Sequence, residues 1–419
     1  MKNTEPTQCE TPSDDLRHFT AYGEPMLRLS PEPEYPVAAV QAGCRVEVRA
    51  TERDSFTEYH VTGTVGRDED GADELLAQVA SAVAERGIQP IQEKFYGLSG
   101  ARADVLKKRE AAWRREELDI AVPVTWIQGA PLLDGDFVGV QIWGIVPHDG
   151  RNGVTTVANP ATGPGRLWTG RGFRMLHLPA IRGVIAGGAL AGDAVAQARQ
   201  MFVNASLGLK AHGMDFRNVR RTWIYLARLL EWYAEFNQVR TAHYRPAGFG
   251  TEGGTAFPAS TGIQGRSGEE ECMMDVLALD SGGPAYAVAA PICRSPRQDA
   301  SFNYGSAFSR GMAFEIEGRR TVHISGTASI NAAGASVHVG DAEMQSLETL
   351  MCIAAILEEQ GGGLANITSA TLFCKNREAW AAWNRVSRLL QIPAFPKVCV
   401  TADVCRHDLL VEMEVVATI

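Results

Sequence analysis

The sequence is poor in long apolar runs, in paired cysteines and in signals for export. No run reaches the roughly 18 apolar residues of a membrane helix, so no membrane span is expected. The beginning of the chain, MKNTEPTQCETPSDD, is polar and acidic and lacks the basic-then-apolar order of a secretory signal. The eight cysteines stand singly, with neither a CxxC pair nor a Cys/His cluster at zinc-ligand spacing. We therefore expect a cytoplasmic protein with reduced thiols, no metal site and no cofactor.

An excess of positive charge is also missing. The chain has 40 Lys and Arg against 49 Asp and Glu, a formal net charge of -9. This balance argues against nucleic acid, or an anionic membrane surface, as a general partner. Hydrophobic residues make up 45% and charged residues 21% of the 419 residues. Such a composition is typical of a soluble globular protein of two to four domains.

Two stretches of the chain repeat each other at a fixed offset. Each begins with a Gly-Asp pair, at Gly192-Asp193 and again at Gly340-Asp341. The same offset then aligns further identical residues without a gap: Gln197 with Gln345, Gly213 with Gly361, Asn218 with Asn366, and Trp232 with Trp380. Chance agreement over such a span is improbable, so the chain contains tandem copies of one unit.

Hydrophobic periodicity predicts the same elements in both copies. In the earlier copy they are strands FRMLHL and RGVIAG, helix 193–212, strand 218–226, helix 227–243, and strands PASTGIQ and CMMDVLAL. In the later copy they are strands GMAFEIE and TVHISG, helix 341–360, strand 366–374, helix 377–391, and strands PKVCVTADV and LLVEMEVVA. Residues 44–147 show the same β-β-α-β-α-β-β order more faintly, as a diverged first copy.

These patterns predict an α/β (α+β) chain of three tandem domains. The expected divisions are an N-terminal tail at 1–43 and domains at 44–147, 165–281 and 296–419, with Gly/Pro/Asn-rich linkers at 148–170 and 281–300. A sheet with both helices on one face leaves its other face bare, and three such faces can bury one another. We therefore expect a closed barrel with pseudo-threefold symmetry, an intramolecular pseudo-trimer that is a monomer or a small homo-oligomer.

The element order, the segment HISGTASI and the ending FPKVCV…LLVEMEVVA resemble the RidA/YjgF family. That resemblance implies homotrimer-like packing with active sites in the clefts between units. Lys397 stands where the family has its carboxylate-binding arginine, and Cys399 follows two residues later. The lysine is a departure from the family pattern, and it speaks against plain enamine-deaminase activity.

Residues 165–419 resemble the chorismatase family more closely. The elements that carry this resemblance are Phe308-Ser309-Arg310-Gly311, the segment 324–330 with Gly326, and the C-terminal Glu412. The resemblance implies that the enolpyruvyl group of chorismate is removed as pyruvate, with Glu412 as the general acid. It further implies that a cysteine seven residues earlier, here Cys405, marks the members that form 3-hydroxybenzoate.

The chemistry of chorismate suits these residues. Cleavage of its enol ether begins with protonation of a carbon atom, which needs a positioned acid of raised pKa. Glu412 stands between apolar residues on a strand that also places Glu414 on the same face. The two carboxylates of chorismate call for cations, for which Lys397, Arg310 and Arg240 are candidates.

Further expectations concern the cleft itself. A cleft between the second and third copies would bring Arg240 near Glu412, and backbone N–H groups around Gly326 would add donors. In the second copy Met273 stands opposite Glu412, so we expect one active site rather than three.

Four alternatives stay open at this level. Within the same class, chorismate would be hydrolysed to a dihydroxycyclohexadiene carboxylate, or 4-hydroxybenzoate would form. Outside that class, the chain would be a RidA-like imine or enamine deaminase, or a metabolite-binding protein without activity.

Overall fold

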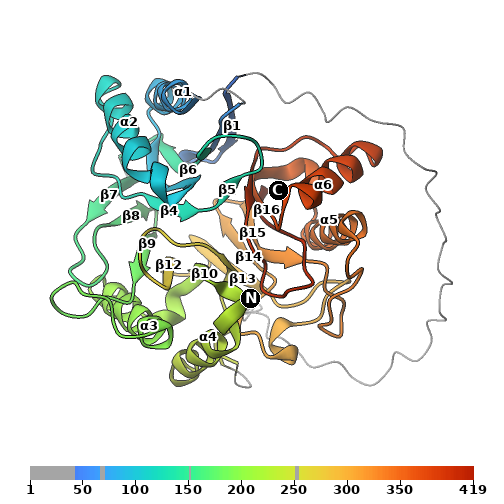
Figure 1. Ribbon diagram of the computed structural model, residues 1–419. Helices are drawn as coiled ribbons and strands as arrows, with labels where there is room; N and C mark the ends of the chain where they lie inside the picture. Colours follow the sequence, from blue (N-terminus) through green and yellow to red (C-terminus); the bar gives the residue numbers. More distant parts are fainter. Residues whose placement is uncertain (1–42, 67–70, 151, 251–253) are drawn as a thin grey trace.

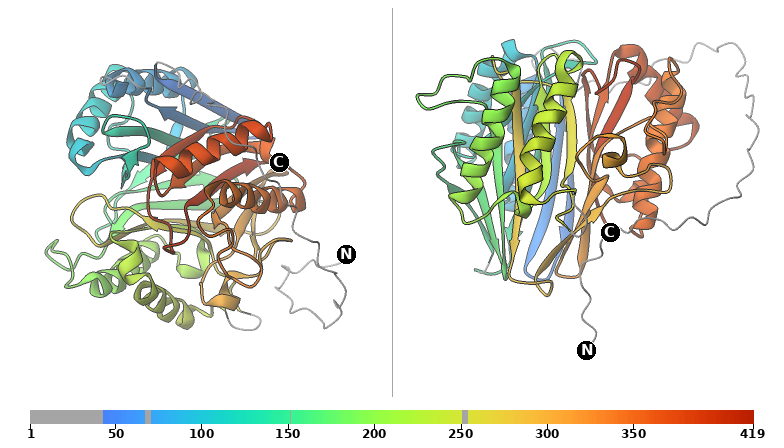
Figure 2. Two further views of the ribbon diagram at one scale, coloured as in Figure 1. Left: turned by 45° about the vertical axis from the view of Figure 1, so that its right-hand side comes forward. Right: turned by 90° about the horizontal axis from the view of Figure 1, so that it is seen from below.

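The computed structural model describes residues 43–66, 71–150, 152–250 and 254–419, so the expected N-terminal tail lies outside the described residues except for Gly43. Three sheets stand around a common centre, and the helices lie outside them (Figures 1 and 2). The helices are α1 (Gly71–Arg86), α2 (Arg102–Arg115), α3 (Ala194–Lys210), α4 (Leu229–Tyr244), α5 (Ala342–Glu359) and α6 (Arg377–Leu389).

The first sheet has the order β1-β2-β6-β3-β4. Its strands are β1 (Arg45–Glu52), β2 (Phe56–Thr64), β3 (Gln89–Gly97), β4 (Thr125–Gln128) and β6 (Phe137–Pro147). All of its neighbours pair antiparallel except β3 and β4. The diverged copy expected at 44–147 therefore has the same plan as the other two.

The second sheet has the order β11-β10-β12-β9-β8-β7. Its strands are β7 (Gly153–Val157), β8 (Gly165–Gly170), β9 (Phe173–Arg182), β10 (Val219–Leu226), β11 (Ala259–Gln264) and β12 (Cys272–Ser281). The third sheet has the order β13-β14-β15-β18-β16-β17-β5. Its strands are β5 (Ala130–Pro131), β13 (Ala287–Ile292), β14 (Gly311–Ile316), β15 (Arg319–Ala328), β16 (Ile367–Cys374), β17 (Lys397–Thr401) and β18 (Val411–Thr418).

The repeated Gly-Asp pairs turn out to be helix starts. Asp193 accepts a hydrogen bond from the backbone N–H of Ala196, and Asp341 accepts one from Met344. Each aspartate thus caps the first turn of the long helix of its unit, which an aspartate does well because its oxygen satisfies an otherwise unpaired N–H. The sequence repeat is therefore a repeat of structure.

Three sequence predictions about elements need correction. FRMLHL is the second strand of its unit rather than the first, and RGVIAG is not a strand beyond Arg182. The segments expected as linkers carry β7, β8 and β13, which extend the edges of two sheets. Their glycine and proline residues predicted loops, but β7 and β13 are edge strands, which tolerate such residues because one side of the strand makes no ladder bonds.

One cysteine also differs from the sequence prediction. Cys293 is disulfide-bonded, whereas reduced thiols were expected.

The inner faces of the three sheets pack against each other, as the bare sheet faces required. One cluster of buried residues draws on all three sheets and includes Trp143, Trp168, Trp223 and Phe314. Separate clusters lie between each sheet and its own helices. Each sheet thus buries both faces, and the expected barrel is present (Figure 2).

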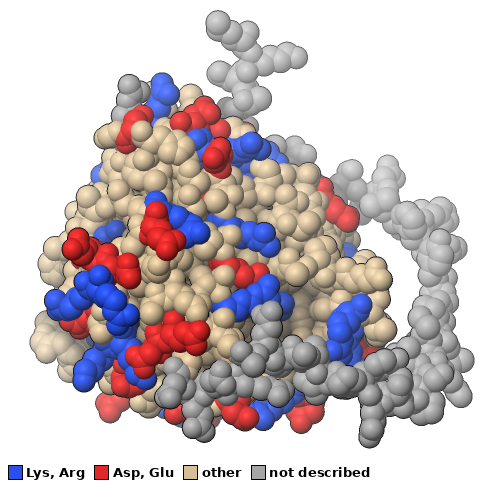
Figure 3. Space-filling view, turned by 90° about the horizontal axis from the view of Figure 1, so that it is seen from above, with Lys and Arg blue, Asp and Glu red and all other residues tan. Residues whose placement is uncertain are grey.

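The surface carries both signs of charge. Figure 3 shows basic and acidic side chains interspersed over one face of the molecule. Among the described residues, no helix is both long and apolar enough to cross a membrane.

Candidate active site

A cavity opens where the edge strand β11 of the second sheet meets β15 of the third. It encloses about 650 Å³ including its mouth, which suits a small metabolite. From the second unit it is lined by Tyr233, Arg240, Ser260 and Gly262. From the third unit it is lined by Ser306, Phe308, Arg310, Gly326, Ala328, Ile330, Cys405, Arg406 and Glu412.

Among the described residues, Glu412 supplies the one carboxylate of this lining. It lies on β18 in the middle of the third sheet, where its register partners are Ala328 and Phe373. The residue is 4% exposed. Burial raises the pKa of Glu412 to about 8, and the negative charge of Glu414 adds to the rise while Arg221 opposes it. The carboxyl is therefore mostly protonated at neutral pH and can donate a proton into the cavity.

Gly326 makes room for that carboxyl. It lies at the end of β15, where the register with β18 shifts between Ile324 and Thr327. A Cβ atom on Gly326 would lie 2.1 Å from Oε1 of Glu412. Any side chain here would displace the acid, so this position requires glycine because of the close approach of the two strands.

Three arginines face the cavity from separate elements. Arg240 on α4 is 1% exposed, its Nη2 donates to Asn237 Oδ1 at 2.6 Å, and its buried Nε has no partner among the described residues. Arg310 is 2% exposed, and its Nε and Nη2 donate to the carbonyl oxygen of Asp299 at 3.0 and 2.9 Å. Arg406 donates to Ser336 Oγ at 3.3 Å. Together they make the cavity cationic around a neutral acid.

Cys405 and Tyr233 line the cavity as neutral groups. Burial, with a smaller contribution from Glu412, raises the pKa of Cys405 to about 12. Burial also raises the pKa of Tyr233 well above its ordinary value. At neutral pH both groups keep their protons, so Cys405 is a thiol rather than the thiolate that acts as a nucleophile.

The structure brings together only part of the site expected from sequence. Arg240, Arg310, Gly326, Cys405 and Glu412 all line the cavity. Gly311 lies just behind it, buried on β14 opposite Ile324.

Lys397 and Cys399 lie elsewhere. Side chains alternate along β17, and Val398 and Val400 point into the barrel. Lys397 and Cys399 therefore face the helices. There Lys397 lies over the ring of Phe395, and Cys399 packs in the cluster under α6.

Sequence reasoning missed Tyr233 and Arg406. Tyr233 lies seven residues before Arg240 on α4, a spacing that puts both on one helix face. Arg406 directly follows Cys405 in a loop. The helix spacing was a usable signal for Tyr233, whereas nothing in the sequence says which way a loop arginine points.

The other inter-unit contacts lack an acid at the corresponding place. Met273 on β12, expected opposite Glu412, is fully buried in the barrel core. In the first sheet the residue at the corresponding position is Gly139 on β6, which packs against the backbone of Gly63. Among the described residues, the cavity between the second and third units is therefore the one that combines a protonated carboxyl with arginines.

A solved structure and a family model match this chain over different lengths. Residues 306–419 match the family model described as Endoribonuclease L-PSP. A crystal structure of a chorismatase superposes with a TM-score of 0.55 at 18% identity, covering 89% of this chain and 98% of that one. A YjgF-family protein of Neisseria meningitidis, NMB1025, matches at 20% identity with a TM-score of 0.24, covering 31% of this chain and 93% of that one. The chain thus has the fold of the chorismatase.

Proposed function

We propose that the protein is a chorismatase that removes the enolpyruvyl group of chorismate as pyruvate. The observation that carries the proposal is a buried, protonated Glu412 that faces a cavity holding three arginines. Chorismate has two carboxylates and an acid-labile enol ether, so it matches both features. The likeness to a chorismatase over most of both chains supports the same reading.

The first chemical step uses Glu412 as a general acid. Its O–H bond breaks as a C–H bond forms at the terminal methylene carbon of the enolpyruvyl group, and an oxocarbenium ion results. Arg240, Arg310 and Arg406 hold the two substrate carboxylates, for which a guanidinium offers paired donors. Carbon accepts protons poorly, so a desolvated acid with a pKa near the working pH contributes about 10² to 10⁴ in rate.

The second step decides the product. In one branch the neighbouring ring hydroxyl attacks the ring carbon that bears the ether. Pyruvate leaves, the hydroxyl proton returns to the Glu412 carboxylate, and the ring rearranges to 3-hydroxybenzoate without net water. In the other branch water attacks the oxocarbenium carbon and leaves a dihydroxycyclohexadiene carboxylate. We propose the first branch, with the Cys405 thiol beside Glu412 steering the ring hydroxyl.

The test is an incubation of the purified protein with chorismate, read by chromatography with mass detection. Equal amounts of pyruvate and 3-hydroxybenzoate are expected. Pyruvate with a diene diol, or with 4-hydroxybenzoate, would keep the reaction class and contradict the role given to Cys405. Absence of pyruvate would contradict the proposal, and ammonia release from an imino acid would then indicate a deaminase.

A further inference from the structure

A buried carboxylate, Glu414, lies behind Glu412 at the centre of the barrel. Glu414 has the position in its sheet that Gln141 has in the first sheet and Asp275 has in the second. The residue two positions after each of them pairs with a histidine on the neighbouring strand: His60 on β2, His177 on β9 and His323 on β15. Glu414 is 6% exposed. It lies outside the cavity that holds Glu412 and instead lines a neighbouring space on the barrel axis.

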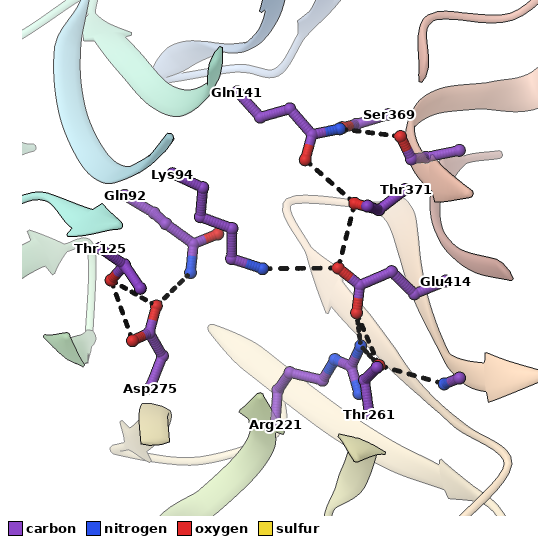
Figure 4. Close-up of polar contacts among 12 residues, drawn as sticks. Gln92, Lys94, Thr125, Gln141, Arg221, Thr261, Asp275, Ser369, Thr371 and Glu414 are labelled. Carbon is purple, nitrogen blue, oxygen red and sulfur yellow. Dashed lines mark hydrogen bonds and ion pairs between the residues drawn. The ribbon is translucent and has the colours of Figure 1, made fainter. Parts of the chain in front are cut away.

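The partners of Glu414 come from all three sheets (Figure 4). Lys94 of β3, in the first sheet, lies 3.5 Å from Oε1, and Nη2 of Arg221, on β10 of the second sheet, lies 2.9 Å from Oε2. Thr371 of β16 donates to Oε1 at 3.2 Å. Two cations and hydroxyl donors overcome the effect of burial and lower the pKa of Glu414. The carboxylate is therefore ionised at neutral pH.

A hydroxyl group links this carboxylate to the acid. Thr261 Oγ1 donates to Oε2 of Glu414 at 2.6 Å and accepts the backbone N–H of Gly326 at 3.1 Å. Gly326 is the residue that packs on the carboxyl of Glu412. Glu414 thus acts on Glu412 in two ways, through its charge two residues away on the same strand face and through the strand end that shapes the site.

We propose that Glu414 is a positioning residue, and that Lys94 and Arg221 hold it as a fixed negative charge that, together with burial, keeps Glu412 protonated at neutral pH. The first unit lends no described residue to the cavity, yet through Lys94 it takes part in setting the proton state of the acid. Glu414 has this role only if Glu412 is the acid of the proposed function.

The other charged and titratable groups around Glu412 do not duplicate this effect. Arg221 lies behind it and favours the ionised form. The cavity lining adds cations and neutral groups: Arg240, Arg310, Arg406, Cys405 and Tyr233. Positive charge lowers the pKa of a carboxyl, so Glu414 is the neighbour whose charge opposes that trend.

The test is Glu414→Gln, a change that keeps the shape and matches the Gln141 of the first sheet. It removes the negative charge and leaves the Arg221 cation near the acid. The alkaline limit of pyruvate release is expected to move to lower pH by about one unit or more. The double variant Glu414→Gln/Lys94→Met removes one charge of each sign, so it is expected to fold better than the single variant and to shift the limit in the same direction.

Asp275→Asn is the matched control, because it removes the buried carboxylate at the equivalent position of the second sheet. Its alkaline limit is expected to stay where the wild type has it. An unmoved limit in both Glu414 variants, or an equal shift in Asp275→Asn, would overturn the proposal.

A second readout separates this proposal from the proposed function. Infrared titration of the Glu412 carboxyl without substrate, assigned with Glu412→Gln, is expected to show the same downward shift in the Glu414 variants. A shift without any chorismate turnover would contradict the proposed function and leave the charge network standing. An unshifted titration would overturn the network whatever the turnover.

Discussion

Strands β12 and β18 occupy the same place in two sheets but present different side chains to the barrel. Each carries an inner carboxylate, Asp275 or Glu414, held by hydrogen bonds from several elements. Asp275 accepts hydrogen bonds from Thr125 (Figure 4) and from the backbone N–H of Ala180. Two residues before it stands Met273, whereas two residues before Glu414 stands Glu412. The second and third sheets thus share the inner carboxylate, whereas among the described residues the outer one is present at a single cleft.

The largest effect is expected from removing the outer carboxylate. Glu412→Gln keeps the shape but cannot protonate carbon, so pyruvate release should fall by about 10³ while chorismate still binds, as calorimetry would show. Met273→Leu changes the equivalent residue of β12 and should leave turnover within about twofold of the wild type, because such swaps conserve volume. More than a tenth of the activity left in Glu412→Gln would break the comparison.

Gly326→Ala should come next, with a loss of about 100-fold in kcat, because the new methyl group would push the Glu412 carboxyl aside at a cost of a few kcal/mol. Gly265→Ala is its control, since a Cβ there meets no atom closer than 3.3 Å and the residue lies outside the cavity. Steady-state kinetics with melting temperatures would separate a displaced acid from an unfolded chain. Wild-type kcat in Gly326→Ala would contradict the account.

The arginines and Lys397 allow a test of which cations hold the substrate. Arg240→Met should lower kcat/KM by about 10- to 100-fold, because a charged hydrogen bond contributes about 1.5–3 kcal/mol. Lys397→Met should leave kcat/KM nearly unchanged, because its side chain lies on the helix side of β17. The reverse result would place the substrate outside the cavity described.

Cys405→Ala should have the smallest effect on rate and the clearest effect on product. Consumption of chorismate should stay within about tenfold of the wild type, since the thiol does not supply the first proton. The diene diol should appear at the expense of 3-hydroxybenzoate, as measured by chromatography. An unchanged product ratio would remove Cys405 from the steering role.

Sequence patterns were informative where they repeat or alternate. The offset between the second and third copies predicted the units, and strand alternation put Glu412 and Glu414 on one face. The direction in which a side chain points in the folded protein could not be predicted in the same way. Lys397 looked like a substrate ligand, but one step of alternation on β17 turns it toward the helices. Arg406 reaches the cavity from a loop. The partners of Glu414 meet one another only where the three sheets pack together. No local sequence pattern encodes either arrangement.

The pH dependence of pyruvate release tests the central claim most directly, because Glu412 must carry its proton to act. Its pKa is raised to about 8, so kcat/KM should be level through neutral pH and fall about tenfold per unit above pH 8. The fall should be absent from the residual activity of Glu412→Gln. A wild-type rate that falls already above pH 5, or stays level to pH 10, would contradict a buried, protonated Glu412 as the acid.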